Sequence, residues 1–164
     1  MAKQLFQVTI QHDRPVKDMI DSALEDLGGL HHIIPSGRRV LIKPNLVIAK
    51  TNDTGATTNP EVIEILIQKV LKTNPVEIAL GESSTAGDNT MRAFRVTGMD
   101  KIAQKYGVKV IDFKKAPHLN KEVPRGKEIN SVKISKPIFK YDYLINVPIL
   151  IPYCDNSLSS LLIA

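Results

Sequence analysis

The sequence predicts an α/β fold: an open, mostly parallel sheet with helices on both faces, in a doubly wound, three-layer arrangement. Short apolar runs that suit buried strands alternate along the chain with segments whose apolar residues recur at helical spacing. This alternation is typical of βαβ units, whose crossovers place successive strands parallel. The 164 residues suit a single domain over positions 1–164, large enough to bury a core without disulfides.

The first part of the chain predicts a strand, a helix and a second strand. Residues 5–11 alternate apolar and polar side chains, which is typical of a strand. Residues 16–27 carry apolar side chains at helical spacing, and the glycine pair at 28–29 ends that helix. Residues 39–43 have a continuous apolar centre and therefore predict a short strand.

A polar, turn-rich loop over 49–59 leads into the next helix. Asn59 suits the cap of this helix, and Pro60 suits its first position, where the missing N–H costs nothing. Its expected buried stripe consists of Val62, Ile63, Leu66, Ile67, Val70 and Leu71. Residues 76–80 then predict a strand, which a loop of small residues over 81–87 follows.

The second half continues the alternation. A helix is expected from about residue 89, broken near Gly98 and resumed to Tyr106. Residues 114–130 form a basic, proline-containing connection without clear periodicity, long enough to suggest a functional segment. Three further strands are expected at 108–112, 131–134 and 143–147.

Composition excludes several classes of protein. The one cysteine, Cys154, cannot form an internal disulfide, and with no CxxC pair we expect no iron–sulfur cluster in this chain. The four histidines lack metal-binding spacing, so no metal site is expected, and no cofactor can be named. The sequence shows neither a secretory signal nor a membrane-spanning stretch, which favours a cytoplasmic protein without a membrane partner.

The net charge of +5 is mild, with a local basic tendency in the second half of the chain. A basic patch attracts phosphate or nucleic acid, although a solvated basic face is the commoner explanation. No nucleic-acid-binding motif is present, so we expect no specific nucleic-acid partner. The lysines that make up this tendency are Lys114, Lys115, Lys133, Lys136 and Lys140.

Polar residues follow three of the expected strands at the point where each strand ends. In an open α/β sheet, ligands bind beyond the carboxyl ends of the strands. We therefore expect a site for a small anionic ligand there. Its candidate ligand-binding residues are Lys43, Asn45, Ser83, Ser84 and Asn146.

Each candidate has a structural alternative. Lys43 offers a cation suited to phosphate or carboxylate, or is a solvated lysine at a strand end. Asn45 orients a ligand or forms a turn after the proline. The serines at 83 and 84 lie before a helix whose free N–H groups bind anions, or they belong to an ordinary connection. Glu82 is a weak candidate for an acid–base or metal-binding role, and the sequence leaves open whether the chain is an enzyme.

Four motifs together resemble a prokaryotic family, the domain of unknown function numbered 362. They are Val40-Leu-Ile-Lys-Pro-Asn-Leu-Val47, Gly55-Ala-Thr-Thr-Asn-Pro-Glu-Val62, Leu80-Gly-Glu-Ser83 and Leu144-Ile-Asn-Val-Pro148. The resemblance runs in order from about residue 5 to residue 148. It implies a cytoplasmic α/β domain, often associated with redox proteins, whose iron–sulfur clusters lie in a further segment, and for which no reaction is generally assigned.

The chain departs from this family after Pro148. Members continue with a lysine, a histidine and a further helix, whereas here the stretch is Ile149-Leu-Ile-Pro-Tyr-Cys154. We therefore expect the domain to be incomplete at its C-terminus relative to the family.

Three functions follow from these observations. The first is an α/β domain that binds a small anion at the carboxyl ends of its strands. The second is a redox-associated protein whose clusters lie in a missing segment or in a partner. The third is a non-catalytic remnant with a structural or interaction role, whose apolar tail over 158–163 forms an interface with a partner or a second copy of the chain.

Overall fold

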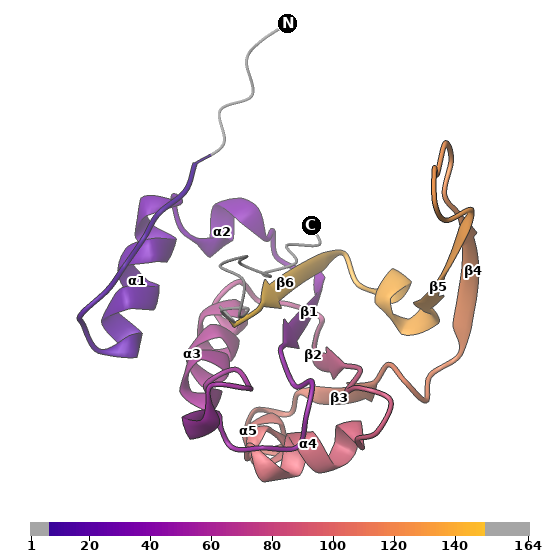
Figure 1. Cartoon of the computed structure of the whole chain (residues 1–164). Helices are drawn as coiled ribbons and strands as arrows, with labels where there is room; N and C mark the ends of the chain where they lie inside the picture. The colour runs from indigo at the N-terminus through magenta and orange to yellow at the C-terminus, as the bar shows by residue number, and fades with distance from the viewer. Residues whose placement is uncertain (1–6, 150–164) are drawn as a thin grey trace, which may run out of the picture.

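The computed structural model describes residues 7–149, and within it four parallel strands form one open sheet (Figure 1). The strands lie in the order β3-β2-β1-β6, so the chain starts in the middle of the sheet and adds strands on both sides. The bounds are β1 (Arg39–Pro44), β2 (Glu77–Glu82), β3 (Lys109–Asp112) and β6 (Tyr143–Val147). The predicted α/β class with an open, parallel sheet is confirmed.

The described part of the chain contains five α-helices and two short 3₁₀ helices, and the first two α-helices precede the first strand. The α-helices are α1 (Val16–Asp26), α2 (Leu30–Ile33), α3 (Pro60–Leu71), α4 (Thr90–Val96) and α5 (Met99–Tyr106). The 3₁₀ helices are η1 (Asn52–Thr54) and η2 (Lys136–Lys140). The helix predicted from residue 89 is indeed broken, since Gly98 adopts a positive φ of 75° between α4 and α5.

The main core lies on one face of the sheet, where helices α3, α4 and α5 cover it. Alternate side chains of β1 and β2 point into this core, because side chains along a strand alternate between its two faces. Its members include Val40, Ile42, Ile78 and Leu80 from the strands and Ile63, Ile67, Phe94 and Met99 from the helices. All of these side chains are buried.

The second face carries a smaller core. Leu41 and Ala79 point to this side, where the ring of Phe113 packs on them. The cover on this face comes from η2, through Ile138, and from Tyr141 just after it. The helical cover is therefore uneven, with the α-helices on the main core and a single 3₁₀ turn on the other face.

Two predicted segments differ in the structure. The strand expected over 5–11 is wrong for residues 7–11, which have no regular structure, and its first two residues lie outside the described range. Val8 and Ile10 are both 82% exposed, so the apolar side chains of the alternating segment do not pack on a sheet. The helical stripe of α3 also differs at two positions, since Leu71 is 42% exposed whereas Ile65 is buried.

The connection over 114–130 contains a strand that the sequence did not indicate. Strand β4 (His118–Glu122) pairs antiparallel with β5 (Ser131–Ser135). Only β5 was predicted from the sequence. Together they form a two-stranded arm that stands away from the body of the sheet in Figure 1. We call residues 114–140 the basic arm, because they include this hairpin, its flanking lysines and η2.

Candidate functional site

The carboxyl ends of β1, β2 and β6 meet at one edge of the sheet, as the sequence predicted. Lys43 pairs with Asn146 in the parallel register between β1 and β6. On the other side of β1, Ile42 pairs with Leu80, which places the end of β2 level with the end of β1. We call this region the carboxyl edge.

An ion pair between Lys43 and Glu82 lies at the centre of the carboxyl edge. Lys43 Nζ donates to Glu82 Oε2 at 3.0 Å. The Glu82 side chain is only 6% exposed, whereas that of Lys43 is 36% exposed. A buried carboxylate is costly without a partner of opposite charge. The Lys43 ammonium compensates the charge of Glu82, and Glu82 in turn fixes the position of the ammonium.

Backbone groups complete the surroundings of the Glu82 carboxylate. Its Oε1 accepts from the Ser83 N–H at 2.7 Å, and its Oε2 lies 3.4 Å from the Leu46 N–H that points to it. Both carboxylate oxygens are therefore occupied within the protein. This arrangement makes Glu82 an anchor that ties the end of β2 to the loop after β1.

Ser84, a predicted ligand-binding residue, is buried and hydrogen-bonds within the protein. Its Oγ donates to the Leu46 carbonyl at 2.6 Å, and its N–H donates to Thr90 Oγ1 at 3.2 Å. The hydroxyl proton is thus used to hold two loops together. Ser84 positions the loop after β2 relative to the loop after β1.

Asn45 has a similar role on the other side of the edge. Its Nδ2 donates to the Ala56 carbonyl at 3.1 Å, and its N–H donates to Thr58 Oγ1 at 2.8 Å. Thr58 Oγ1 then donates to the Val147 carbonyl at 2.8 Å. Asn45 and the buried Thr58 therefore fasten the 49–59 loop onto the ends of β1 and β6.

Two predicted residues keep their side chains available at the carboxyl edge. Ser83 is exposed, and Asn146 is partly buried beside Lys43. Within residues 7–149 neither side chain makes a hydrogen bond, in contrast to Asn45 and Ser84. With the partly exposed Lys43, they are the predicted binding residues whose side chains are not fully engaged in hydrogen bonds within the described residues.

Sequence reasoning missed two residues that shape this edge. Asp88 Oδ2 accepts from the Ala49 N–H at 2.6 Å, and this backbone hydrogen bond is the first cause that lowers the pKa of Asp88. Lys114 Nζ donates to three carbonyls of the same turn, those of Thr85, Ala86 and Asp88, at 2.8, 3.2 and 2.8 Å. Both partners are far away along the chain, so no local pattern indicated them.

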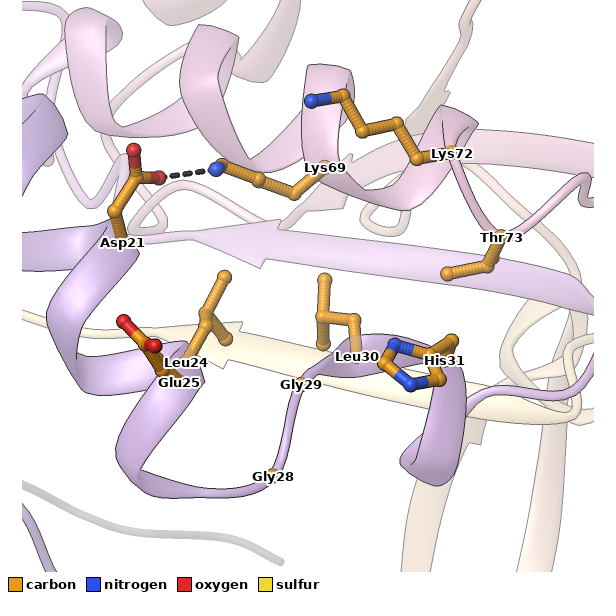
Figure 2. A pocket seen from close by; sticks show the side chains of 10 residues that line it. All are labelled: Asp21, Leu24, Glu25, Gly28, Gly29, Leu30, His31, Lys69, Lys72 and Thr73. Atoms are coloured by element: carbon orange, nitrogen blue, oxygen red, sulfur yellow. Dashed lines mark ion pairs between the residues drawn. The ribbon is translucent and has the colours of Figure 1, made fainter.

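A cavity of about 410 Å³ lies elsewhere, between α1, α2 and the end of α3 (Figure 2). Leu24, Leu30 and Thr73 are among the residues that line it, and Asp21 forms an ion pair with Lys69 there. Asp21 also pairs with Lys17 at 2.6 Å. These two lysines, Lys17 first, lower the pKa of Asp21 to about 2.

The lowered pKa of Asp21 predicts an acid-sensitive contact between α1 and α3. The folded pKa of about 2 is below the ordinary value of 3.8, so the contribution of this carboxylate to stability is present above pH 3.8 and is lost as the pH falls towards 2. We expect Lys69→Met to move the acid-unfolding midpoint to higher pH, because the carboxylate then protonates earlier. Circular dichroism against pH measures this, and an unchanged midpoint would contradict the role of the pair.

Two absences bear on the chemistry of the chain. Between residues 7 and 149 no three His, Cys, Asp or Glu side chains gather in a way that could hold a metal ion. None of the helices in that range is long and apolar enough to cross a membrane. Cys154 and the apolar tail over 158–163, on which the interface hypothesis depends, lie outside the described residues.

Comparison with known proteins gives one family and one relative. The model of the family described as Domain of unknown function (DUF362) matches residues 40–150, which include all the strand ends of the carboxyl edge. A protein of Synechocystis sp. named Thylakoid-associated protein sll1697 is 26% identical over 125 residues, covering 76% of this chain. The match covers 37% of that relative, so the chain spans well under half of its length. No solved structure matches.

Proposed function

Because the chain belongs to the DUF362 family, whose description names no reaction, we propose a function from the site itself: the carboxyl edge binds a small anionic ligand. The binding groups are Lys43, Ser83 and Asn146. In this proposal Asn45 and Ser84 also serve the site, since they hold the loops that frame it. Glu82 anchors the lysine.

The observation that carries the proposal is the state of Lys43. An ammonium group has three donors, and Lys43 uses one of them on Glu82. Its side chain is 36% exposed, and in this proposal the remaining donors are the ones that an anion accepts from. A lysine fixed in this way loses little side-chain freedom on binding, which favours affinity for an anion.

The side chains beside Lys43 offer hydrogen-bond donors, which suit a small anion. Asn146 lies beside it on the next strand, about 4.8 Å away by strand spacing, and offers amide N–H donors. Ser83 adds a hydroxyl at the end of β2. Phosphate and carboxylate groups accept such donors, which makes phosphorylated metabolites and carboxylates the favoured ligand class.

A thermal-unfolding screen tests the proposal. The wild-type chain is heated with inorganic phosphate, phosphorylated metabolites, carboxylates or divalent metals. A ligand at about 100 times its dissociation constant adds roughly 2.7 kcal/mol of stability. The double variant Lys43→Met/Glu82→Gln removes both charges of the pair and so leaves no unpaired buried carboxylate.

Lys50→Met is the matched control, because Lys50 is exposed near the same edge and forms no ion pair among the described residues. We expect an anion to stabilise the wild type and Lys50→Met but not the double variant. Equal stabilisation of all three chains would exclude Lys43 as the binding group.

The other hypotheses have weaker support. The relative is described as thylakoid-associated, and its name says nothing of a ligand. A redox partner or a second copy of the chain remains a proposal, as does a cytoplasmic location. No contact between residues 7 and 149 favours one of these over ligand binding.

A further inference from the structure

The positive charge of the protein is concentrated in one segment. The basic arm, residues 114–140, carries eight Lys or Arg and two Asp or Glu, a net charge of +6. The rest of the chain has fourteen basic and fifteen acidic residues, a net charge of −1, so the whole +5 arises in the arm. A field of this kind raises the local concentration of anions around the segment.

The base of the basic arm closes over a cavity of about 730 Å³. Its floor is formed by the first residues of β1 and β2, Arg39 and Glu77, and by the whole of β3, Lys109–Asp112. Its roof is η2 and the residue after it, which contribute Pro137, Phe139, Lys140 and Tyr141. This volume is within the range of about 300–1,000 Å³ that is typical of small-molecule sites.

The acidic groups of this cavity are engaged within the protein. Glu77 Oε1 accepts from the Tyr141 hydroxyl at 2.6 Å. Burial raises the pKa of Tyr141, and the hydrogen bond to Glu77 raises it further, so the hydroxyl keeps its proton. Asp112 Oδ1 accepts from the backbone N–H groups of Lys114 and Lys115.

The basic groups of the cavity are not engaged in this way. Arg39, Lys109 and Lys140 are exposed and form no ion pair with any residue between 7 and 149. Arg39 and Lys109 flank β2, where Arg39 pairs with Glu77 and Lys109 with Ala79. Their backbones are therefore roughly 12 Å apart, a span that two long side chains can bridge around one anionic group. Ile111, Pro137 and Phe139 give the same cavity an apolar wall.

We infer that this cavity is a second binding site, for an organic phosphate with an aromatic or apolar body. Its phosphate groups lie between Arg39, Lys109 and Lys140, and its body lies against Phe139 and Ile111. The cavity lies at the amino ends of β1 and β2 and along the whole of β3, and its lining does not include Lys43, Ser83 or Asn146. It is therefore separate from the anion site proposed at the carboxyl edge and does not depend on it.

Calorimetric titration of the full chain with ADP, in magnesium-free buffer, tests the inference. We expect wild-type protein to bind ADP and Arg39→Gln/Lys109→Gln to bind it at least about tenfold more weakly, because each lost hydrogen bond to a charged group costs roughly that factor. Lys140→Gln, which leaves the sheet untouched, should weaken binding in the same direction. Lys101→Gln, an exposed lysine of α5, is the matched control and should bind as the wild type does.

Four outcomes would overturn the inference. Equal ADP affinity of the wild type, Arg39→Gln/Lys109→Gln and Lys140→Gln would exclude these cations. Loss of binding only in Lys43→Met/Glu82→Gln would place the nucleotide at the carboxyl edge. Inorganic phosphate binding as tightly as ADP would show that the apolar wall takes no part. Binding of duplex DNA or anionic vesicles without binding of ADP would assign the charge to an extended polyanion surface.

Discussion

Lys43→Met is expected to lower the free energy of unfolding by about 2–3 kcal/mol, one of the largest effects of any single change at the carboxyl edge. The substitution leaves the Glu82 carboxylate buried with only backbone N–H partners. Breaking a buried ion pair costs about 3–5 kcal/mol. The lower figure applies here because Lys43 is 36% exposed, so water already screens part of the interaction. Urea unfolding followed by circular dichroism measures the change.

The double variant separates the pair from the rest of the site. Lys43→Met/Glu82→Gln should recover part of the lost stability, because no charge is then left without a partner. Lys50→Met, at an exposed position of the neighbouring loop, should stay within about 0.5 kcal/mol of the wild type. If Lys43→Met were as stable as Lys50→Met, Glu82 would not depend on Lys43.

Gly81→Ala is expected to lower the free energy of unfolding by about 1–3 kcal/mol through overpacking. A Cβ at this position would lie 2.2 Å from Cζ and 2.6 Å from Cε1 of the Phe113 ring. Phe113 is buried against Leu41 and Ala79, so the ring cannot move without disturbing the second core. Urea unfolding measures this change in the free energy of unfolding, and a second substitution at Phe113 tests its cause.

The rescue and the control use neighbouring positions. In a Phe113→Leu background the shorter side chain leaves room for the new methyl group, so Gly81→Ala should cost clearly less there. Gly87→Ala is the matched control, because a Cβ at Gly87 would meet nothing within 4 Å. An equal cost of Gly81→Ala with and without Phe113 would show that the ring is not the obstacle.

Local signals account for the elements that the sequence predicted. The Asn59 side chain accepts from the Glu61 N–H at 2.9 Å and Pro60 is the first residue of α3, so three adjacent residues determine where this helix begins. Strand β4 had no such signal, since its sequence is largely polar and it forms through pairing with β5. Residues 7–11 show the reverse case, where a strand-like pattern finds no partner strand.

The sequence predicted the position of the carboxyl edge but not the hydrogen bonds within it. Parallel strands bring their carboxyl ends together whatever the side chains are, and this is why Lys43 and Asn146 were expected to meet. The hydrogen bond from Lys43 to Glu82 joins residues 39 positions apart, and that from Thr58 to Val147 joins residues 89 apart. Such pairings follow from tertiary packing, which no local spacing encodes.

Amide chemical shifts in a titration with inorganic phosphate test the proposed anion site most directly. Two-dimensional ¹H–¹⁵N spectra of the wild type should show saturable shifts at three amides near the Lys43–Glu82 pair. Those of Leu46 and Ser83 donate to the Glu82 carboxylate, and that of Asn146 lies beside Lys43 on β6. The same signals should stay still in Lys43→Met/Glu82→Gln. If these three amides do not respond to phosphate, or respond equally in the double variant, the carboxyl edge is not an anion-binding site.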